Sequence, residues 1–208
     1  MSRVLIADDH NLIVDAFRKL LEPSCEVVGT VSDGRALLTA ARDLRPDVIV
    51  LDVAMPLLNG LDAGYAIKKM DPSIKLVYVT AYEDPDIAAQ AIRIGSGYLL
   101  KRSAGAELLI AVREATMQRS YVTPLITDGV VRALTQEGGG GGSAEELTFR
   151  QREVLQLLAE GKSMKEVATI LDITPATVAF HKYRMMDQLG IRTSAELVKF
   201  AVQHHLVH

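Results

Sequence analysis

The stretch VIVLD at residues 48–52, four apolar residues that end in an acid, is the clearest indication of the fold. A short, continuous apolar run is typical of a strand covered on both faces, as in a parallel sheet. Comparable runs recur in the first half of the chain, at residues 4–7, 27–28, 76–79 and 98–100. Helical stretches follow the successive runs, near residues 11–22, 34–44, 61–70, 85–94 and 104–117. The alternation predicts an α/β, doubly wound, five-stranded parallel sheet.

Polar residues stand where the predicted strands end. Asp8 and Asp9 follow the first strand, Asp52 follows the third, Thr80 ends the fourth and Lys101 follows the fifth. The carboxyl ends of parallel strands share one edge of the sheet, where such folds bind ligands. Carboxylates that converge there repel one another unless a cation joins them, and a few oxygen ligands suit Mg²⁺. We therefore expect a Mg²⁺ site at this edge.

A carboxylate beside a hard cation, a lysine and a hydroxyl is the arrangement of a phosphoryl-accepting site. Asp52 lies on the middle strand and is the expected acceptor, while the metal and Lys101 would neutralise charge on the transferred group. The alternative is that each acid only caps the helix that follows. That alternative explains a single Asp more readily than the whole set.

Four motifs carry a family resemblance: LIADDH at 5–10, VIVLDVAMPLLNG at 48–60, VYVTAY at 77–82 and GYLLKRS at 97–103. Together they resemble the receiver domain of bacterial two-component response regulators. The resemblance implies that Asp52 accepts phosphate from a sensor histidine kinase and later loses it by autodephosphorylation. It also implies that Asp9 binds Mg²⁺ directly, Asp8 binds it through water, and Asp52 and the backbone carbonyl of Ala54 complete the set.

By the same resemblance, Thr80 and Tyr98 form a coupled switch. The hydroxyl moves to the phosphoryl group and the aromatic ring turns inward. Tyr98 could instead be an ordinary core residue, because aromatic side chains are common at strand ends. The chain departs from many receivers at Arg102, where those have proline after the lysine.

Composition excludes several other classes of protein. The chain has 208 residues, a formal net charge of −3 and a single cysteine, Cys25. One cysteine forms neither an intramolecular disulfide nor a thiolate zinc cluster. The N-terminus is too acidic for a signal peptide, and the longest apolar runs, about five residues, are too short to span a membrane. We expect a soluble, cytoplasmic protein with no membrane partner.

A run of five glycines, Gly138–Gly142, divides the chain. Such runs have a high ordering entropy and are typical of flexible linkers, although a loop of fixed shape is the alternative. We expect a receiver domain at 1–117, a linker at 118–144 and a second domain at 145–208. Thr123-Pro124 and the apolar residues after them suggest a helix inside the linker segment.

Helix caps can be identified in the second domain. Thr148, Ser163 and Thr193 are each followed three residues later by Gln or Glu, the capping-box pattern. Thr174 precedes a proline, which is favoured at the first position of a helix. These signals predict an all-α, four-helix domain with helices at about 149–160, 164–171, 175–189 and 194–205.

The second and third of these helices, with a short turn between them, have the sizes of a DNA-binding helix-turn-helix. The segment 147–191 resembles the LuxR-type domain, and its combination with a receiver is the NarL/FixJ class of response regulators. The resemblance implies binding to double-stranded DNA. Candidate contacts are the residues Lys165, Thr177, Ala179, Phe180, Lys182, Tyr183 and Arg184. Among them, Ala179 and Phe180 could contact a thymine methyl, and the Lys, Arg and Thr side chains could contact phosphates.

The DNA-binding pattern has departures. Met164, Ala179 and Gln188 stand where the family often has Asn, Lys and Lys. The absence of two lysines predicts that a monomer binds DNA with modest affinity, and dimerisation would supply the remaining affinity. The last helix carries Val198, Ala201 and Val202 at helical spacing, and by resemblance it forms a homodimer in the active state. Ordinary core packing is the alternative.

These features predict a DNA-binding transcription regulator that phosphorylation of Asp52 activates. One alternative is a regulator of the same architecture that works without phosphorylation, and another is a small helical domain that binds protein. A dehalogenase-like phosphatase would also use an Asp nucleophile, Mg²⁺ and Lys. That enzyme class needs Asp-x-Asp, whereas this chain has Asp52-Val53-Ala54.

Overall fold

A computed structural model describes residues 1–135 and 147–207. The chain forms two compact units, one built mainly from the first of these ranges and the other mainly from the second. The glycine run Gly138–Gly142, expected to be a flexible linker, lies outside the described residues.

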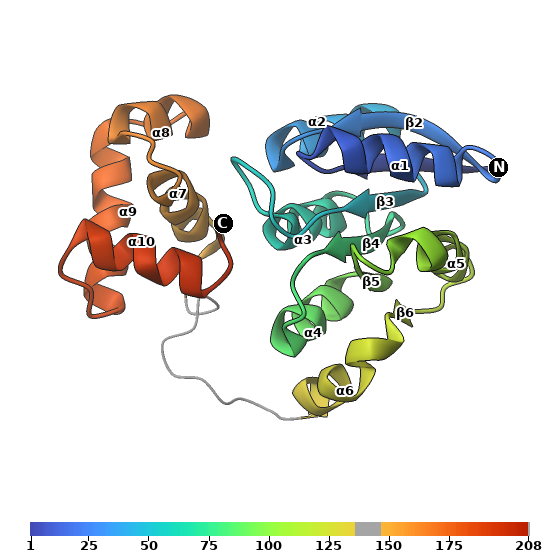
Figure 1. Ribbon diagram of the computed structural model, residues 1–208. Coiled ribbons are helices and arrows are strands. Elements are labelled where there is room, and N and C mark those ends of the chain that lie inside the picture. The colour runs from blue at the N-terminus through green and yellow to red at the C-terminus, as the bar shows by residue number, and fades with distance from the viewer. Residues whose placement is uncertain (136–146, 208) are drawn as a thin grey trace. The chain divides into compact units, whose positions relative to one another are not determined.

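The first unit is a parallel sheet flanked by helices (Figure 1). Its strands are β1 (Ser2–Ala7), β2 (Cys25–Val31), β3 (Val48–Leu51), β4 (Lys75–Thr80), β5 (Gly97–Leu100) and β6 (Tyr121–Val122). Its helices are α1 (Asn11–Leu21), α2 (Gly34–Leu44), α3 (Gly60–Met70), α4 (Pro85–Ile94), α5 (Ala104–Thr116), the 3₁₀ turn η1 (Pro124–Ile126) and α6 (Thr127–Thr135). The strand order is β2-β1-β3-β4-β5-β6, and every neighbouring pair is parallel.

The predicted doubly wound sheet is confirmed, but the expected number of five strands was wrong. A sixth strand, β6, pairs with β5 inside the segment that we assigned to the linker. It was missed because two residues, Tyr121 and Val122, are too few to show any periodicity. The helix suggested after Thr123-Pro124 is present as α6.

Helices cover both faces of the sheet. On one face, α1 and α5 pack on alternate strand residues such as Val4, Val50 and Val79. The intervening strand residues, including Leu5 and Tyr78, are fully buried on the other face, where α2 and α3 lie. Burial on both faces explains why the strands are continuous apolar runs rather than alternating patterns.

The described residues of the second unit form four helices, α7 (Phe149–Ala159), α8 (Met164–Leu171), α9 (Pro175–Gln188) and α10 (Ser194–Gln203). All three expected capping boxes are formed, at Thr148, Ser163 and Thr193, and Thr174 caps α9 through the backbone N–H of Thr177. Apolar side chains from all four helices form one core, which includes Val154, Val167, Val178, Met185 and Leu197.

Candidate phosphorylation site and DNA-binding helix

The sheet topology brings the predicted acidic residues together. Asp8 and Asp9 follow β1, Asp52 follows β3, and these two strands are hydrogen-bonded neighbours. Four potential metal ligands, one atom from each residue, lie within 4.8 Å of one another; they belong to Asp8, Asp9, His10 and Asp52. The carboxylate oxygens fit a hard divalent cation such as Mg²⁺. His10 was not among the predicted ligands, although its position directly after Asp8 and Asp9 could have indicated that it lies near them.

Lys101 joins two of these carboxylates. Its Nζ lies 2.7 Å from Oδ2 of Asp8 and 2.7 Å from Oδ2 of Asp52. The side chains of Asp8 and Asp52 are only 2% and 3% exposed, so the ion pairs are shielded from water. Burial lowers the pKa of Lys101, but the two carboxylates outweigh it and leave the pKa above its ordinary value. The lysine therefore stays charged at neutral pH.

Asp52 has an unusual environment for a carboxylate. Burial raises the pKa of Asp52, and the attraction of Lys101 lowers it only in part, so that the net shift is upward. The nearby Asp8 charge also raises the pKa, and the backbone N–H of Ala54, 3.3 Å from Oδ1, opposes it. A cation beside this group would favour the ionised, nucleophilic form. The carbonyl of Ala54 as a metal ligand stays a prediction.

The backbone after Asp52 leaves no room for side-chain atoms at Gly60. A Cβ placed there would lie 1.9 Å from the carbonyl oxygen of Asp52. The Gly60 N–H donates to the carbonyl of Val53 at 2.7 Å, which closes the loop. Glycine at this position therefore allows the loop to pack directly against the backbone of Asp52.

The two switch candidates lie on neighbouring strands, β4 and β5. Thr80 is 1% exposed, and its hydroxyl oxygen accepts the N–H of Tyr82 at a long 3.4 Å. Tyr98 is fully buried, and its hydroxyl donates to the carbonyl of Tyr82 at 2.8 Å. Both side chains thus contact the same residue of the loop before α4. A switch role for the pair stays a prediction.

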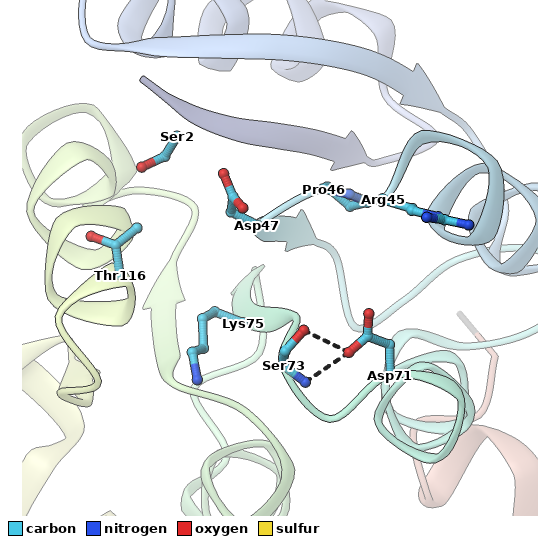
Figure 2. A pocket seen from close by; sticks show the side chains of 8 residues that line it. All are labelled: Ser2, Arg45, Pro46, Asp47, Asp71, Ser73, Lys75 and Thr116. Carbon is cyan, nitrogen blue, oxygen red and sulfur yellow. Dashed lines mark hydrogen bonds between the residues drawn. The ribbon is translucent and has the colours of Figure 1, made fainter.

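The opposite edge of the sheet carries a hollow of about 420 Å³ (Figure 2). It lies at the amino ends of the strands, where Ser2 begins β1 and Lys75 begins β4. Among the lining residues, Asp71 accepts from the N–H and hydroxyl of Ser73 at 2.9 and 2.6 Å, and Lys75 donates to the neighbouring Gln118 at 3.0 Å. These groups have local partners, so the acidic edge stays the candidate functional site.

The helix-turn-helix consists of α8, a turn and α9. Asp172 caps the end of α8 in the left-handed conformation with φ 51°, and Thr174 caps the start of α9. Arg150 of α7 forms an ion pair with Glu153 of the same helix at 2.9 Å and donates to the carbonyl of Leu171, the last residue of α8, at 2.8 Å. The hydrogen bond ties the end of α8, just before the turn, to α7.

Several predicted DNA contacts are exposed on α8 and α9. Phe180 and Tyr183 are 57% and 62% exposed, and the side chains of Lys165 and Arg184 are also exposed. Thr177, Ala179 and Lys182 are half-buried, and Lys182 donates to the hydroxyl of Ser194 at 2.9 Å. Phe180 and Tyr183 lie one helical turn apart on α9, so their exposed rings share one face of the helix. A DNA-contacting role for this face stays a prediction.

The predicted dimer face on α10 needs one correction. Val198 and Val202 are 38% and 44% exposed, but Ala201 is fully buried in the core of the domain. Helical spacing could not distinguish these residues, because adjacent apolar positions on α10 serve both the core and the surface. Only Val198 and Val202 remain candidates for a dimer contact.

Two family models match the chain at these sites. Residues 4–113 match the response regulator receiver domain, and residues 145–201 match the LuxR family of bacterial regulatory proteins. A receiver sheet with an acidic edge, followed by a helix-turn-helix, defines a class of proteins, the two-component response regulators. The chain belongs to the NarL/FixJ class of this family, the transcriptional response regulators with a LuxR-type DNA-binding domain.

Individual relatives extend over the whole chain. The transcriptional regulatory protein LiaR of Bacillus subtilis (strain 168) is 33% identical over 211 residues and covers both chains fully. MctR of Rhizobium johnstonii is 30% identical and covers 99% of this chain and 95% of its own. Among solved structures, the RcsB response regulator of Salmonella typhimurium superimposes with a TM-score of 0.65 at 27% identity, over 98% of both chains. An RcsB–DNA complex matches with a TM-score of 0.58, again at 27% identity and 98% coverage.

In the ranges 1–135 and 147–207, we find no helix with both the length and the apolar character needed to span a membrane.

Proposed function

We propose that the chain is a transcription regulator of a two-component system that phosphorylation of Asp52 switches on. The observation that carries this proposal is the buried ion-pair cluster of Lys101, Asp8 and Asp52 at the carboxyl edge of the sheet. A lysine held between a candidate nucleophile and a candidate metal ligand is positioned to pair with a phosphoryl group.

In this mechanism, an Oδ atom of Asp52 attacks the phosphorus of a phosphohistidine on a sensor histidine kinase. The O–P bond forms as the N–P bond breaks, and the histidine nitrogen takes the electron pair. Lys101 moves its charge toward the phosphoryl oxygens, which releases part of its pairing with Asp52. A bound Mg²⁺, held by Asp8, Asp9, Asp52 and the carbonyl of Ala54, would neutralise charge on the same oxygens. Attack of water on the phosphorus later breaks the bond to Oδ, releases inorganic phosphate and regenerates the Asp52 carboxylate.

The consequence at the other end of the chain is DNA binding. The exposed face of α9 would enter the major groove, and the cations near it would contact phosphates. Val198 and Val202 would join two active chains so that they bind two half-sites. Solved structures of RcsB include dimers bound to DNA, which supports this part of the proposal. We place this activity in the cytoplasm, where the regulator meets both its kinase and its operator.

The proposal is tested by intact-mass measurement and DNA binding before and after incubation with a small phosphodonor and Mg²⁺. We expect wild type to gain the mass of one phosphoryl group and to bind DNA more tightly. Asp52→Ala should gain neither the mass nor the affinity, whereas Asp43→Ala, which removes an exposed acid on α2, should behave as wild type.

Two outcomes would contradict the proposal in different ways. A mass gain without a change in DNA binding would retain the phosphorylation chemistry and exclude the coupling. No mass gain, with a donor that phosphorylates a control receiver, would favour the phosphorylation-independent regulator of the same architecture.

The DNA contacts can be tested with a change of one charge. Arg184→Gln on α9 should weaken DNA binding for all sequences, and the slope of log affinity against log salt should fall by about 1, as expected for one lost phosphate contact. Lys69→Gln makes the same change of charge on an exposed residue of α3 and should leave the slope unchanged. Equal slopes for Arg184→Gln and wild type would show that Arg184 does not contact a phosphate.

A further inference from the structure

The chain does not leave the first unit at the end of α5. It returns along the outer edge of the sheet, where the N–H of Tyr121 donates to the carbonyl of Ser96 at 2.9 Å and the N–H of Thr123 donates to the carbonyl of Tyr98 at 3.0 Å. The following helix, α6, packs on α4 (Figure 1). A Cβ at Gly129 of α6 would lie 2.8 Å from the ring of Pro85, so the two helices are in close contact.

Thr123 is the point at which this returning segment is attached. It is fully buried, and its hydroxyl oxygen accepts the N–H of Leu100 in β5 at 3.2 Å. The same hydroxyl donates to the Glu107 carboxylate of α5 at 2.7 Å. Its carbonyl accepts the N–H of Ile126 and the hydroxyl of Thr127, both at 3.2 Å, as α6 begins. A single side chain and its backbone therefore connect β5, α5 and α6.

A continuous set of hydrogen bonds leads from the phosphorylation site to Thr123. The Thr80 hydroxyl accepts the N–H of Tyr82, the carbonyl of Tyr82 accepts the Tyr98 hydroxyl, and the carbonyl of Tyr98 accepts the N–H of Thr123. The first of these bonds is the longest, 3.4 Å, and is the one that Thr80 gives up if its hydroxyl turns toward a phosphoryl group. An ion pair between Glu83 and Arg102 ties the same loop to the residue after Lys101.

We propose that Thr123 is a positioning residue that transmits the phosphorylation of Asp52 to α6, the last helix before the glycine-rich segment. The inference rests on the proposed function, because it requires that Asp52 be phosphorylated. When Thr80 turns to the phosphoryl group, the Tyr82 backbone loses one of its bonds and the loop that begins α4 can move. Tyr98 follows through its bond to the Tyr82 carbonyl, and Thr123 follows Tyr98. The helix α6 then responds from both sides, through Thr123 and through its packing on α4.

Hydrogen exchange of the α6 amides, residues 127–135, tests this inference on the full chain. Exchange is measured with and without a small phosphodonor and Mg²⁺, and intact mass reports phosphorylation in the same samples. In wild type, we expect phosphorylation to change the exchange rates in α6 by at least about 3-fold. Thr123→Val has the same shape but no hydroxyl. It should gain the same phosphoryl mass while the change in α6 falls to less than half of the wild-type value.

Three further variants separate a coupling role from a merely structural one. Thr123→Ser keeps the hydroxyl and should restore the response. Glu107→Ala removes the acceptor of that hydroxyl without changing the buried residue, and it should weaken the response even if Thr123→Val folds poorly. Thr135→Val is the control, since the bonds that its hydroxyl makes among the described residues go to carbonyls of its own helix. A merely structural Thr123 would alter α6 exchange equally with and without phosphate.

The remaining outcomes are also distinct. A mass gain in wild type without any change in α6 would overturn the inference and leave the proposed function intact. A response of Thr123→Val equal to that of wild type would do the same. Failure of wild type to gain mass would contradict the proposed function, and the inference with it.

Discussion

Replacing Lys101 by Met should slow phosphorylation of Asp52 by about 100- to 1,000-fold, the range found when one charge-stabilising donor is removed from an active site. The ammonium group lies 2.7 Å from both Asp8 and Asp52. Its removal takes a positive charge away from Asp52 and from the phosphoryl group that Asp52 would accept, so the charge of the transition state is less well stabilised. Single-turnover kinetics with a small phosphodonor, followed by intact mass, measure the effect.

Lys75→Met is the matched control for this result. Lys75 lies at the opposite edge of the sheet and donates to Gln118. Its loss should leave the phosphorylation rate unchanged within about 2-fold, because the charge lies beyond a Debye length of roughly 10 Å in normal buffer. A rate for Lys101→Met close to that of wild type would show that Lys101 has a structural role only.

Gly64→Ala should lower the free energy of unfolding by about 3 kcal/mol, the upper part of the usual range for overpacked cores. A Cβ at Gly64 would lie 2.0 Å from the hydroxyl oxygen of Tyr78, which is fully buried beneath α3. Within the described part of the chain, this hydroxyl has no hydrogen-bond partner. Burial, and then the charge of Asp62, raise the pKa of Tyr78, so the phenol is neutral.

The clash can be relieved by a second change. Tyr78→Phe removes the obstructing oxygen and an unsatisfied polar group, so alone it should be neutral or stabilising by up to about 1 kcal/mol. The double variant Gly64→Ala/Tyr78→Phe should recover at least half of the lost stability, which denaturant unfolding of each variant would measure. Gly105→Ala on α5, where a Cβ meets nothing within 4 Å, should instead stabilise by up to about 1 kcal/mol. If the effects of Gly64→Ala and Tyr78→Phe on the free energy of unfolding were additive, a clash between these two residues would be excluded.

The sequence was most informative where structure depends on near neighbours. The capping residues Ser163 and Thr174 give the starts of α8 and α9 correctly, because each cap bonds to a backbone N–H within three residues. The strand ends likewise located the acidic edge, since a parallel sheet brings all carboxyl ends to one side. Asp8, Asp52 and Lys101 could therefore be grouped from their positions at the ends of apolar runs alone.

Features that depend on distant contacts were missed. The burial of Thr123 arises from contacts with Leu100 and Glu107, which no local pattern reports. Ala201 and Val202 are adjacent and both apolar, yet one is buried in the core and the other is exposed. Local periodicity cannot distinguish such residues when the apolar stripe is wider than the core requires.

The short strand β6 also bears on solubility. An uncovered edge of a sheet presents free N–H and carbonyl groups to which a strand of another molecule can add, the first step of edge-to-edge aggregation. The residues of β5 after Gly97 are Tyr, Leu and Leu, so an uncovered β5 would be prone to such aggregation. The two residues of β6 pair with Gly97 and Tyr98 of β5. The hydroxyl of Thr123 accepts the N–H of Leu100, as the backbone carbonyl of a longer strand would. The edge of β5 that carries Tyr98 is thus covered by the chain's own backbone, and the outer strand on this side of the described sheet is only two residues long.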